Sequence, residues 1–293
     1  SVIWHLEAGA AYRAAGDYTN SNSHFEAAVA GIEKYEAQAK VKLANEAGAI
    51  MSNQQNLPYE GKSYDKIMLH TYRALNYLAL GDVEKARPEI IRAYQRQQDA
   101  VDENVKRIEK AQEEEAKHKD KATIEKAKAD PKFATAVDGI AKDTEGFKFY
   151  ADYVNPFTVY LDGIYFLHAG AGNSDLERAV KSFNRVIEVA GDNKFVAADL
   201  ASATGTATNV DDALTYILFE TGQGASLDQV RIDIPIIISK VSYVGAAFPK
   251  LVRHNGELPS LSVQAGAVQE TTLPLSSMDS DRKSTRLNSS HRT

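Results

Sequence analysis

Two segments of the chain repeat one pattern of small and large residues, and this pattern constrains the fold more than any other feature. In residues 9–28 it consists of Gly9, Tyr12, Gly16, Tyr18, Ser21, Phe25 and Ala28. Residues 74–93 place Ala74, Tyr77, Gly81, Val83, Ala86, Ile90 and Ala93 at the same seven offsets. This spacing predicts a pair of helical hairpins, because its small and large residues recur at helical intervals on both sides of a glycine turn.

The residues of the first copy have separate predicted roles, which their counterparts in the second copy share. Gly9 lets the second helix of the hairpin approach the first closely, and Tyr12 fills the gap beside it. Gly16 ends the first helix in a left-handed turn, and Asp17 caps the helix that follows. Phe25 closes the hairpin from its far helix.

A third, looser copy begins at Gly163 and Phe166 and continues with Ala179, Phe183 and Val186. Its turn is four residues longer than the turn of the other copies. The three copies resemble the tetratricopeptide repeat, and an unrelated bundle of helical hairpins is the alternative interpretation. The copies begin 65 and 89 residues apart, so they cannot form a plain tandem array, which repeats about every 34 residues.

The segments between the copies are predicted to extend the helical part of the chain. Residues 32–51 are rich in alanine and predict a helix, and residues 53–62 predict a loop. Residues 95–130 are highly charged and predict a helical segment that projects into solvent. This segment is interpreted either as an arm that docks a partner or as a solvated helix with no partner.

The pattern changes near residue 211. The run Leu214–Glu220 and the alternation of Val230, Ile232 and Ile234 predict strands, and weaker runs follow at 241–247 and 261–267. The predicted fold class is therefore mainly α. Hairpins similar to tetratricopeptide repeats, with long insertions, form a domain over residues 1–205, and a small, incomplete β or α+β domain covers residues 211–280.

Both ends of the chain look interrupted. Residues 281–291, DRKSTRLNSSH, resemble the translation of a short-read sequencing adapter, so residues 281–293 are interpreted as an artefactual tail. The chain opens at Ser1, without Met, inside a helical pattern, and we expect any export signal to lie upstream.

Three blocks, in order, carry a resemblance that covers nearly all of residues 1–280. They are YEGKSYDKIMLHTYRALNYLALGD at 59–82, NPFTVYLDGIYFLHAG at 155–170 and YILFETGQGASLDQVRIDIPI at 216–236. The chain is similar to a family of uncharacterised bacterial tetratricopeptide-like proteins. Because members of that family carry a lipoprotein signal, the resemblance implies a lipid-anchored protein of the bacterial cell envelope, with no established activity.

The composition excludes several kinds of site. The chain has no cysteine, which excludes disulfides, thiolate nucleophiles and zinc sites built on sulfur. Its net charge of −6 argues against nucleic-acid binding. The common phosphate-binding, dinucleotide-binding and hydrolase motifs do not occur, and the histidines lack metal-ligand spacing. We therefore expect no catalytic residue, no metal and no cofactor. The Gly-rich segment 170–174 precedes a helix and invites an anion-binding interpretation, although a lengthened turn explains it better.

The sequence predicts an adaptor or scaffold that binds another protein or peptide through the inner face of its hairpins. The matched offsets place Leu6, Arg13, Thr71, Leu78, Tyr160 and His168 on this face. The loop before the second hairpin adds Tyr59 and Tyr64, with Ser63 as a predicted helix cap and His70 bonded back to the loop. The alternative function is an enzyme, or an enzyme subunit, with a site between the two domains lined by Glu60, Asp65, His70 or His168.

Overall fold

The computed structural model describes residues 1–45, 59–117, 131, 135, 155–207, 214–234, 244–252, 254 and 256–277. The chain forms two compact units, each made of separate stretches of sequence. One unit contains residues 1–98 and 158–184, and the other contains residues 99–157 and 185–293. The predicted boundary near residue 205 differs from the three points at which the chain passes between these units, after residues 98, 157 and 184. Residues 281–293 lie outside the described residues.

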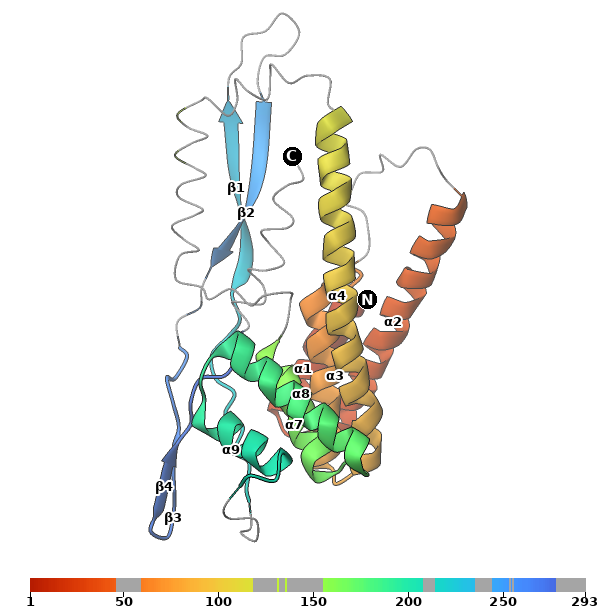
Figure 1. Ribbon diagram of the computed structural model, residues 1–293. Helices are drawn as coiled ribbons and strands as arrows, with labels where there is room; N and C mark the ends of the chain where they lie inside the picture. Colours follow the sequence, from red (N-terminus) through yellow and green to blue (C-terminus); the bar gives the residue numbers. More distant parts are fainter. Residues whose placement is uncertain are drawn as a thin grey trace, which may run out of the picture. The chain divides into compact units, whose positions relative to one another are not determined.

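The described chain is mainly helical, with its strands near the C-terminal end, as the sequence predicts (Figure 1). The helices are α1 (Val2–Ala14), α2 (Tyr18–Asn45), α3 (Ser63–Ala79), α4 (Val83–Lys117), α7 (Pro156–His168), α8 (Asn173–Ala190) and α9 (Lys194–Ala203). The strands are β1 (Ser226–Ile234), β2 (Val244–Val252), β3 (Ser262–Ala265) and β4 (Val268–Thr271). β1 pairs antiparallel with β2, and β3 pairs antiparallel with β4.

Glycine brings the two helices of the first and third hairpins into close contact. A Cβ atom added to Gly9 in α1 would lie 2.6 Å from the ring of Phe25 in α2. In the third hairpin, a Cβ atom on Gly163 in α7 would lie 2.5 Å from the ring of Phe183 in α8. Both separations are shorter than van der Waals contact, so each ring occupies the space that a larger residue would need. The predicted close approach is confirmed at these two positions.

The second hairpin, α3 and α4, buries the corresponding residues. Ala74 is fully buried in α3, and Ile90 is buried in α4. The small residues that the pattern placed later in the second helix of each hairpin are also buried, and they are Ser21, Ala28, Ala86, Ala93 and Ala179. The offsets of the repeat therefore mark buried positions in all three hairpins.

The turns of the first two hairpins follow the prediction. Gly16 and Gly81 have φ angles of 79° and 77°, a left-handed conformation that glycine enters at little cost. The Asp17 carboxylate accepts a hydrogen bond from the backbone N–H of Asn20 at 3.1 Å, which caps α2. Asp82 caps α4 in the same way through the backbone N–H of Lys85, at 3.2 Å.

The aromatic residue predicted three positions after the small residue does not have the same surroundings in every hairpin. Phe166 is buried in the third hairpin, as predicted. Tyr12 is 39% exposed, and its ring stacks on His24 at the surface of the first hairpin. The prediction that Tyr12 fills the gap beside Gly9 is wrong, because the Phe25 ring already covers that glycine.

The first hairpin packs against α3 through one apolar cluster. Val2, Phe25, Ala28 and Ile32 from α1 and α2 meet Leu69 of α3 in this cluster. Leu6, Tyr59 and Tyr72 are partly buried against the same residues. Because burying apolar area is the main favourable term in folding, this cluster joins the first hairpin to the second.

The insertions and the strands agree with the prediction only in part. α2 and α4 continue beyond the repeat pattern to Asn45 and Lys117, as predicted, and residues 46–58 and 118–130 lie outside the described residues. β1 spans the predicted alternation and runs from the partner pair Ser226–Val252 to the pair Ile234–Val244. Residues 214–220 form no strand, which corrects the prediction for that run.

Candidate functional site

Arg13, predicted on the inner face, links the first hairpin to α3. Its guanidinium donates a hydrogen bond to the side-chain oxygen of Asn76 at 3.0 Å and lies 4.8 Å from the centre of the Tyr72 ring. Asn76 is fully buried and donates in turn to the hydroxyl of Ser21 at 2.8 Å. Ser21 donates to the backbone carbonyl of Gly9 at 2.7 Å. Arg13 therefore ends a polar chain that joins α1, α2 and α3.

Two of the predicted face residues lie in the core. Thr71 is fully buried, and its hydroxyl donates to the backbone carbonyl of Ile67 at 2.9 Å and contacts the Thr158 hydroxyl at 2.8 Å. Tyr160 is 6% exposed and packs edge-on against Phe183. Neither side chain offers a surface to a partner in this conformation, because each is buried against another helix of the chain, Thr71 against α7 and Tyr160 against α8. Their placement on an open binding face is corrected.

The other predicted face residues remain at least partly accessible. Leu6 and Leu78 are half-buried, and His168 is exposed near the end of α7. The structure does not gather the eight residues into one cluster. They divide between the core, the contact of the first hairpin with α3, and the surface.

The loop before α3 is held by Asp65. The Tyr59 hydroxyl and the backbone N–H of Lys62 both donate to the Asp65 carboxylate, the latter at 2.9 Å. Burial and the neighbouring Asp65 charge raise the pKa of Tyr59, so its hydroxyl keeps its proton. Ser63 is the first residue of α3, so the cap predicted at Ser63 is replaced by Asp65, which bonds back to Lys62. Tyr64 is half-buried in the first turn of α3.

A buried hydrogen bond between a histidine and a carboxylate joins α3 to α4. Nδ1 of His70 lies 2.7 Å from Oε2 of Glu89, and both side chains are almost inaccessible to solvent. Arg92 donates to the other carboxylate oxygen of Glu89 at 2.7 Å, and Arg73 lies 3.5 Å from the same atom. The predicted hydrogen bond from His70 to the preceding loop does not form, because the ring points toward α4.

The pKa values of this pair have opposing contributions. Burial lowers the pKa of His70 and outweighs the Glu89 carboxylate, which favours the protonated ring. Burial also disfavours the charged form of Glu89, but the hydrogen bond from His70 and the charge of Arg73 prevail and lower its pKa. Near neutral pH a neutral His70 therefore donates its Nδ1–H to an ionised Glu89.

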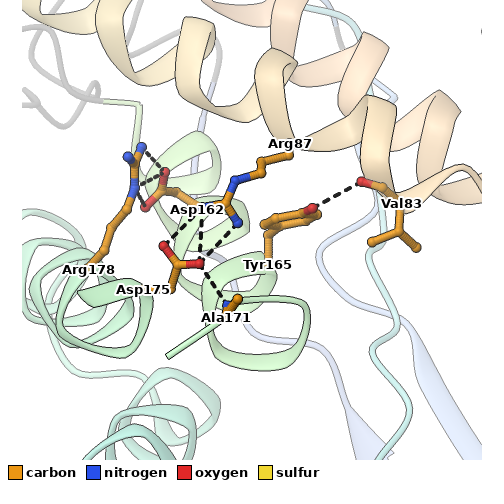
Figure 2. Close-up of polar contacts among 7 residues, drawn as sticks. All are labelled: Val83, Arg87, Asp162, Tyr165, Ala171, Asp175 and Arg178. Carbon is orange, nitrogen blue, oxygen red and sulfur yellow. Dashed lines mark hydrogen bonds and ion pairs between the residues drawn. The ribbon is translucent and has the colours of Figure 1, made fainter. Parts of the chain in front are cut away.

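A second group of charges, the arginine–aspartate cluster, consists of Arg87, Asp162, Asp175 and Arg178, with Ser182 beside Asp162. Figure 2 shows Arg87 pointing at Asp175, with Arg178 alongside Asp162. Arg87 reaches both carboxylate oxygens of Asp175 at 3.0 Å. Arg178 donates to Asp162 at 2.7 Å, and the Ser182 hydroxyl donates to the same carboxylate at 2.6 Å. Each charge is matched by an opposite charge of the cluster.

Aromatic rings complete the arginine–aspartate cluster. The guanidinium groups of Arg87 and Arg178 lie 4.8 Å and 4.3 Å from the centre of the Phe166 ring. The Tyr165 hydroxyl donates to the backbone carbonyl of Val83 at 3.0 Å, which fixes α7 to the start of α4 (Figure 2). The cluster thus connects α4, α7 and α8 through paired charges, stacked rings and the hydrogen bond from Tyr165 to the Val83 carbonyl.

The Gly-rich turn before α8 binds a carboxylate of the chain itself, that of Asp175. The Asp175 carboxylate accepts the backbone N–H of Ala171 at 2.8 Å (Figure 2). The hydrogen bond from Arg87 and that backbone N–H lower the pKa of Asp175. A Cβ atom on Gly170 would lie 2.2 Å from the backbone oxygen of Phe166, so the close packing of this turn requires glycine. The lengthened-turn interpretation explains this segment, since Asp175 takes the place that an external anion would need.

An aromatic group lies on the surface of the first hairpin. The aromatic cluster consists of Trp4, His5, Tyr12 and His24. Trp4 is 59% exposed, and its ring lies edge-on to both imidazoles, with centroid separations of 5.1 Å to His5 and 5.2 Å to His24. Nδ1 of His5 lies 3.1 Å from Nδ1 of His24. Neither histidine was predicted to have a role from its spacing alone.

The residues of the predicted enzyme site have separate surroundings. Asp65 is engaged by Tyr59, and His70 is buried with Glu89. Glu60 and His168 are exposed. Across the described ranges, no group of three or more histidine, aspartate or glutamate side chains converges to hold a metal ion. In the same ranges, no helix combines the length and the apolar character needed to cross a membrane.

Sequence reasoning missed the polar pairs that join different helices. Glu89 lies one position before the buried Ile90 of the repeat pattern, and Arg87 and Asp175 are 88 residues apart. The only sequence signal was helical periodicity, which places His70 and Arg73 on one side of α3 but does not identify their partners. No family model, no curated protein and no solved structure matches the chain.

Proposed function

We propose that this chain is a non-catalytic adaptor that holds another protein or a peptide on its helical hairpins. The observation that carries the proposal is the closure of hairpins by one small residue against one large ring, as at Gly9 with Phe25 and at Gly163 with Phe183. Repeated hairpins of this kind build extended surfaces that bind partners and catalyse no reaction. Membership of a tetratricopeptide-like lipoprotein family is part of the proposal and is supported by the three sequence blocks alone.

The buried polar groups support an adaptor because internal contacts engage them. His70 bonds to Glu89, and the Asp162 carboxylate bonds to Arg178 and Ser182. Catalysis by such groups requires that they reach a substrate. Here they hold pairs of helices together, which is the requirement of a scaffold with a fixed surface.

The proposed binding face comprises the accessible residues of the predicted set. Leu78 near the end of α3 and His168 near the end of α7 are its most useful probes, because each has a matched residue elsewhere. Leu80 follows Leu78 by two positions and is exposed, and His254 is an exposed histidine of the other unit.

The experiment is capture of partners from a solubilised bacterial envelope fraction with the whole chain as bait. We expect one protein to be recovered in a fixed ratio and to be lost with Leu78→Ala or His168→Gln, but retained with Leu80→Ala and His254→Gln. Capture that is unchanged in the first two variants would exclude this face. The envelope location has a separate test, in which fractionated cells expressing the complete gene should retain the protein with their membranes.

A further inference from the structure

The two imidazoles of the aromatic cluster meet end to end. Their Nδ1 atoms are 3.1 Å apart, while their ring centroids are 5.4 Å apart. The centroid separation exceeds the nitrogen separation by about two ring radii, which occurs when the two nitrogens point directly at each other. One Nδ1 therefore carries a proton and donates it to the lone pair of the other.

This contact accepts one additional proton but not two. In the neutral pair, the donor ring has its proton on Nδ1, and the acceptor ring has its proton on Nε2. A first added proton goes to Nε2 of the donor, which becomes an imidazolium and still donates through Nδ1. A second added proton must occupy Nδ1 of the acceptor. It removes the lone pair that accepts the hydrogen bond and leaves two protonated nitrogens, 3.1 Å apart in the closed contact, facing each other.

The surroundings oppose the second proton. Among the described residues, the side chain whose charge reaches His5 is His24 on α2. Burial and the neighbouring His24 both lower the pKa of His5. Tyr12, the other titratable member of the aromatic cluster, stacks on His24 with ring planes 15° apart.

We propose that His5 and His24 form a one-proton switch that keeps the aromatic cluster closed near neutral pH and opens it in acid. In the closed state both imidazoles hold the Trp4 ring, and Tyr12 covers His24. When the second proton binds, the imidazolium rings separate and Trp4 loses both edge contacts. The hairpin itself stays paired, because Phe25 against Gly9 and the bond from Ser21 to the Gly9 carbonyl contain no group that titrates in this range. Acid therefore rearranges the surface of the first hairpin without unfolding it.

The chain provides its own reporter, since Trp4 is its single tryptophan. An imidazolium beside an indole quenches its fluorescence, so the first proton should lower Trp4 emission, and separation of the rings by the second proton should restore it. A titration of the whole chain from about pH 7 to about pH 4.5 keeps most carboxylates ionised. We expect the recovery of emission well below about pH 6.5, the ordinary pKa of histidine, with helical circular dichroism unchanged.

The matched variants are His24→Gln and His254→Gln. In His24→Gln the remaining His5 has no imidazole neighbour, so emission should fall in a single step with no recovery at lower pH. His254→Gln removes an exposed histidine elsewhere and should leave the curve unchanged. Identical curves for the unchanged chain and His24→Gln would overturn the proposal, as would loss of the recovery in His254→Gln.

A second measurement covers the case in which His24→Gln fails to fold. In the unchanged chain, ¹⁵N spectra of the histidine rings should show one protonated and one unprotonated Nδ1 at neutral pH. On acidification, the two rings should take up protons in separate steps. If the two rings instead took up protons independently, each near the ordinary pKa of histidine, the proposal that they share a proton would be contradicted.

Discussion

Two glycines set how closely helices approach in the first and third hairpins. Gly9 and Gly163 lie under the rings of Phe25 and Phe183, and a single added methyl group would overlap those rings. In an ordinary helix, replacing glycine by alanine stabilises the helix by about 1 kcal/mol. Where close packing requires glycine, the same replacement should instead destabilise the protein. The residue scale therefore offers a direct test of the repeat pattern.

Gly163→Ala should destabilise the protein by about 1–3 kcal/mol. The overlap of the new Cβ with Phe183 costs more than the higher helix propensity of alanine contributes. Urea unfolding followed by circular dichroism measures the loss. Phe183→Leu added to Gly163→Ala should recover part of it, since the smaller side chain makes room for the methyl group. Equal stability of Gly163→Ala and the unchanged chain would show that Gly163 is not needed for close packing.

At the scale of helices and strands, the pairing of α3 with α4 depends on the protonation states of His70 and Glu89. The folded pKa of His70 and that of Glu89 both lie below their ordinary values of 6.5 and 4.5. When the pH falls below an ordinary value, the unfolded chain binds a proton that the folded chain does not. The stability from this pair is complete above about pH 6.5 and decreases as acid is added.

His70→Gln should flatten the pH dependence of the free energy of unfolding between about pH 7 and pH 5. Glutamine can still donate to Glu89, but it does not titrate. Urea unfolding at a series of pH values measures the slope, with His254→Gln as the control that should retain the slope of the unchanged chain. A slope that is the same in His70→Gln would mean that His70 does not contribute to acid sensitivity.

Elements were predicted well where local signals and tertiary contacts agree. The turns at Gly16 and Gly81 and the caps at Asp17 and Asp82 depend on residues within four positions, so they could be predicted from the sequence. The run 214–220 has strand composition, yet no strand forms there. A strand requires a neighbour to complete its hydrogen bonds, and strand propensity depends on that context.

At the scale of the whole molecule, one compact unit combines residues 1–98 with residues 158–184. The contacts that bring these distant segments together are the bond between Thr71 and Thr158, the Arg87–Asp175 pair and the bond from Tyr165 to Val83. Because each contact joins the second hairpin to the third, the two hairpins should unfold together.

Hydrogen exchange in low urea should give α3 and α7 one common free energy of opening. Arg178→Ala leaves the buried Asp162 carboxylate without its ion-pair partner and should lower protection in both helices by about 3 kcal/mol. Arg185→Ala is the matched control from the same helix, since Arg185 pairs with the more exposed Glu188. Exchange of α7 independently of α3 in the unchanged chain would contradict a single cooperative unit.

The sequence by itself determined the hairpins, their turns and the small residues at their contacts, because these follow from periodicity and from backbone preferences of neighbouring residues. It did not determine which predicted face residues stay accessible. Thr71 is a core residue because α7 packs against α3, Tyr160 is buried against Phe183 of α8, and His70 bonds to Glu89 rather than to the nearby loop. Tertiary structure decided these outcomes, since a buried polar group must find a partner and that partner is fixed by the packing of distant helices.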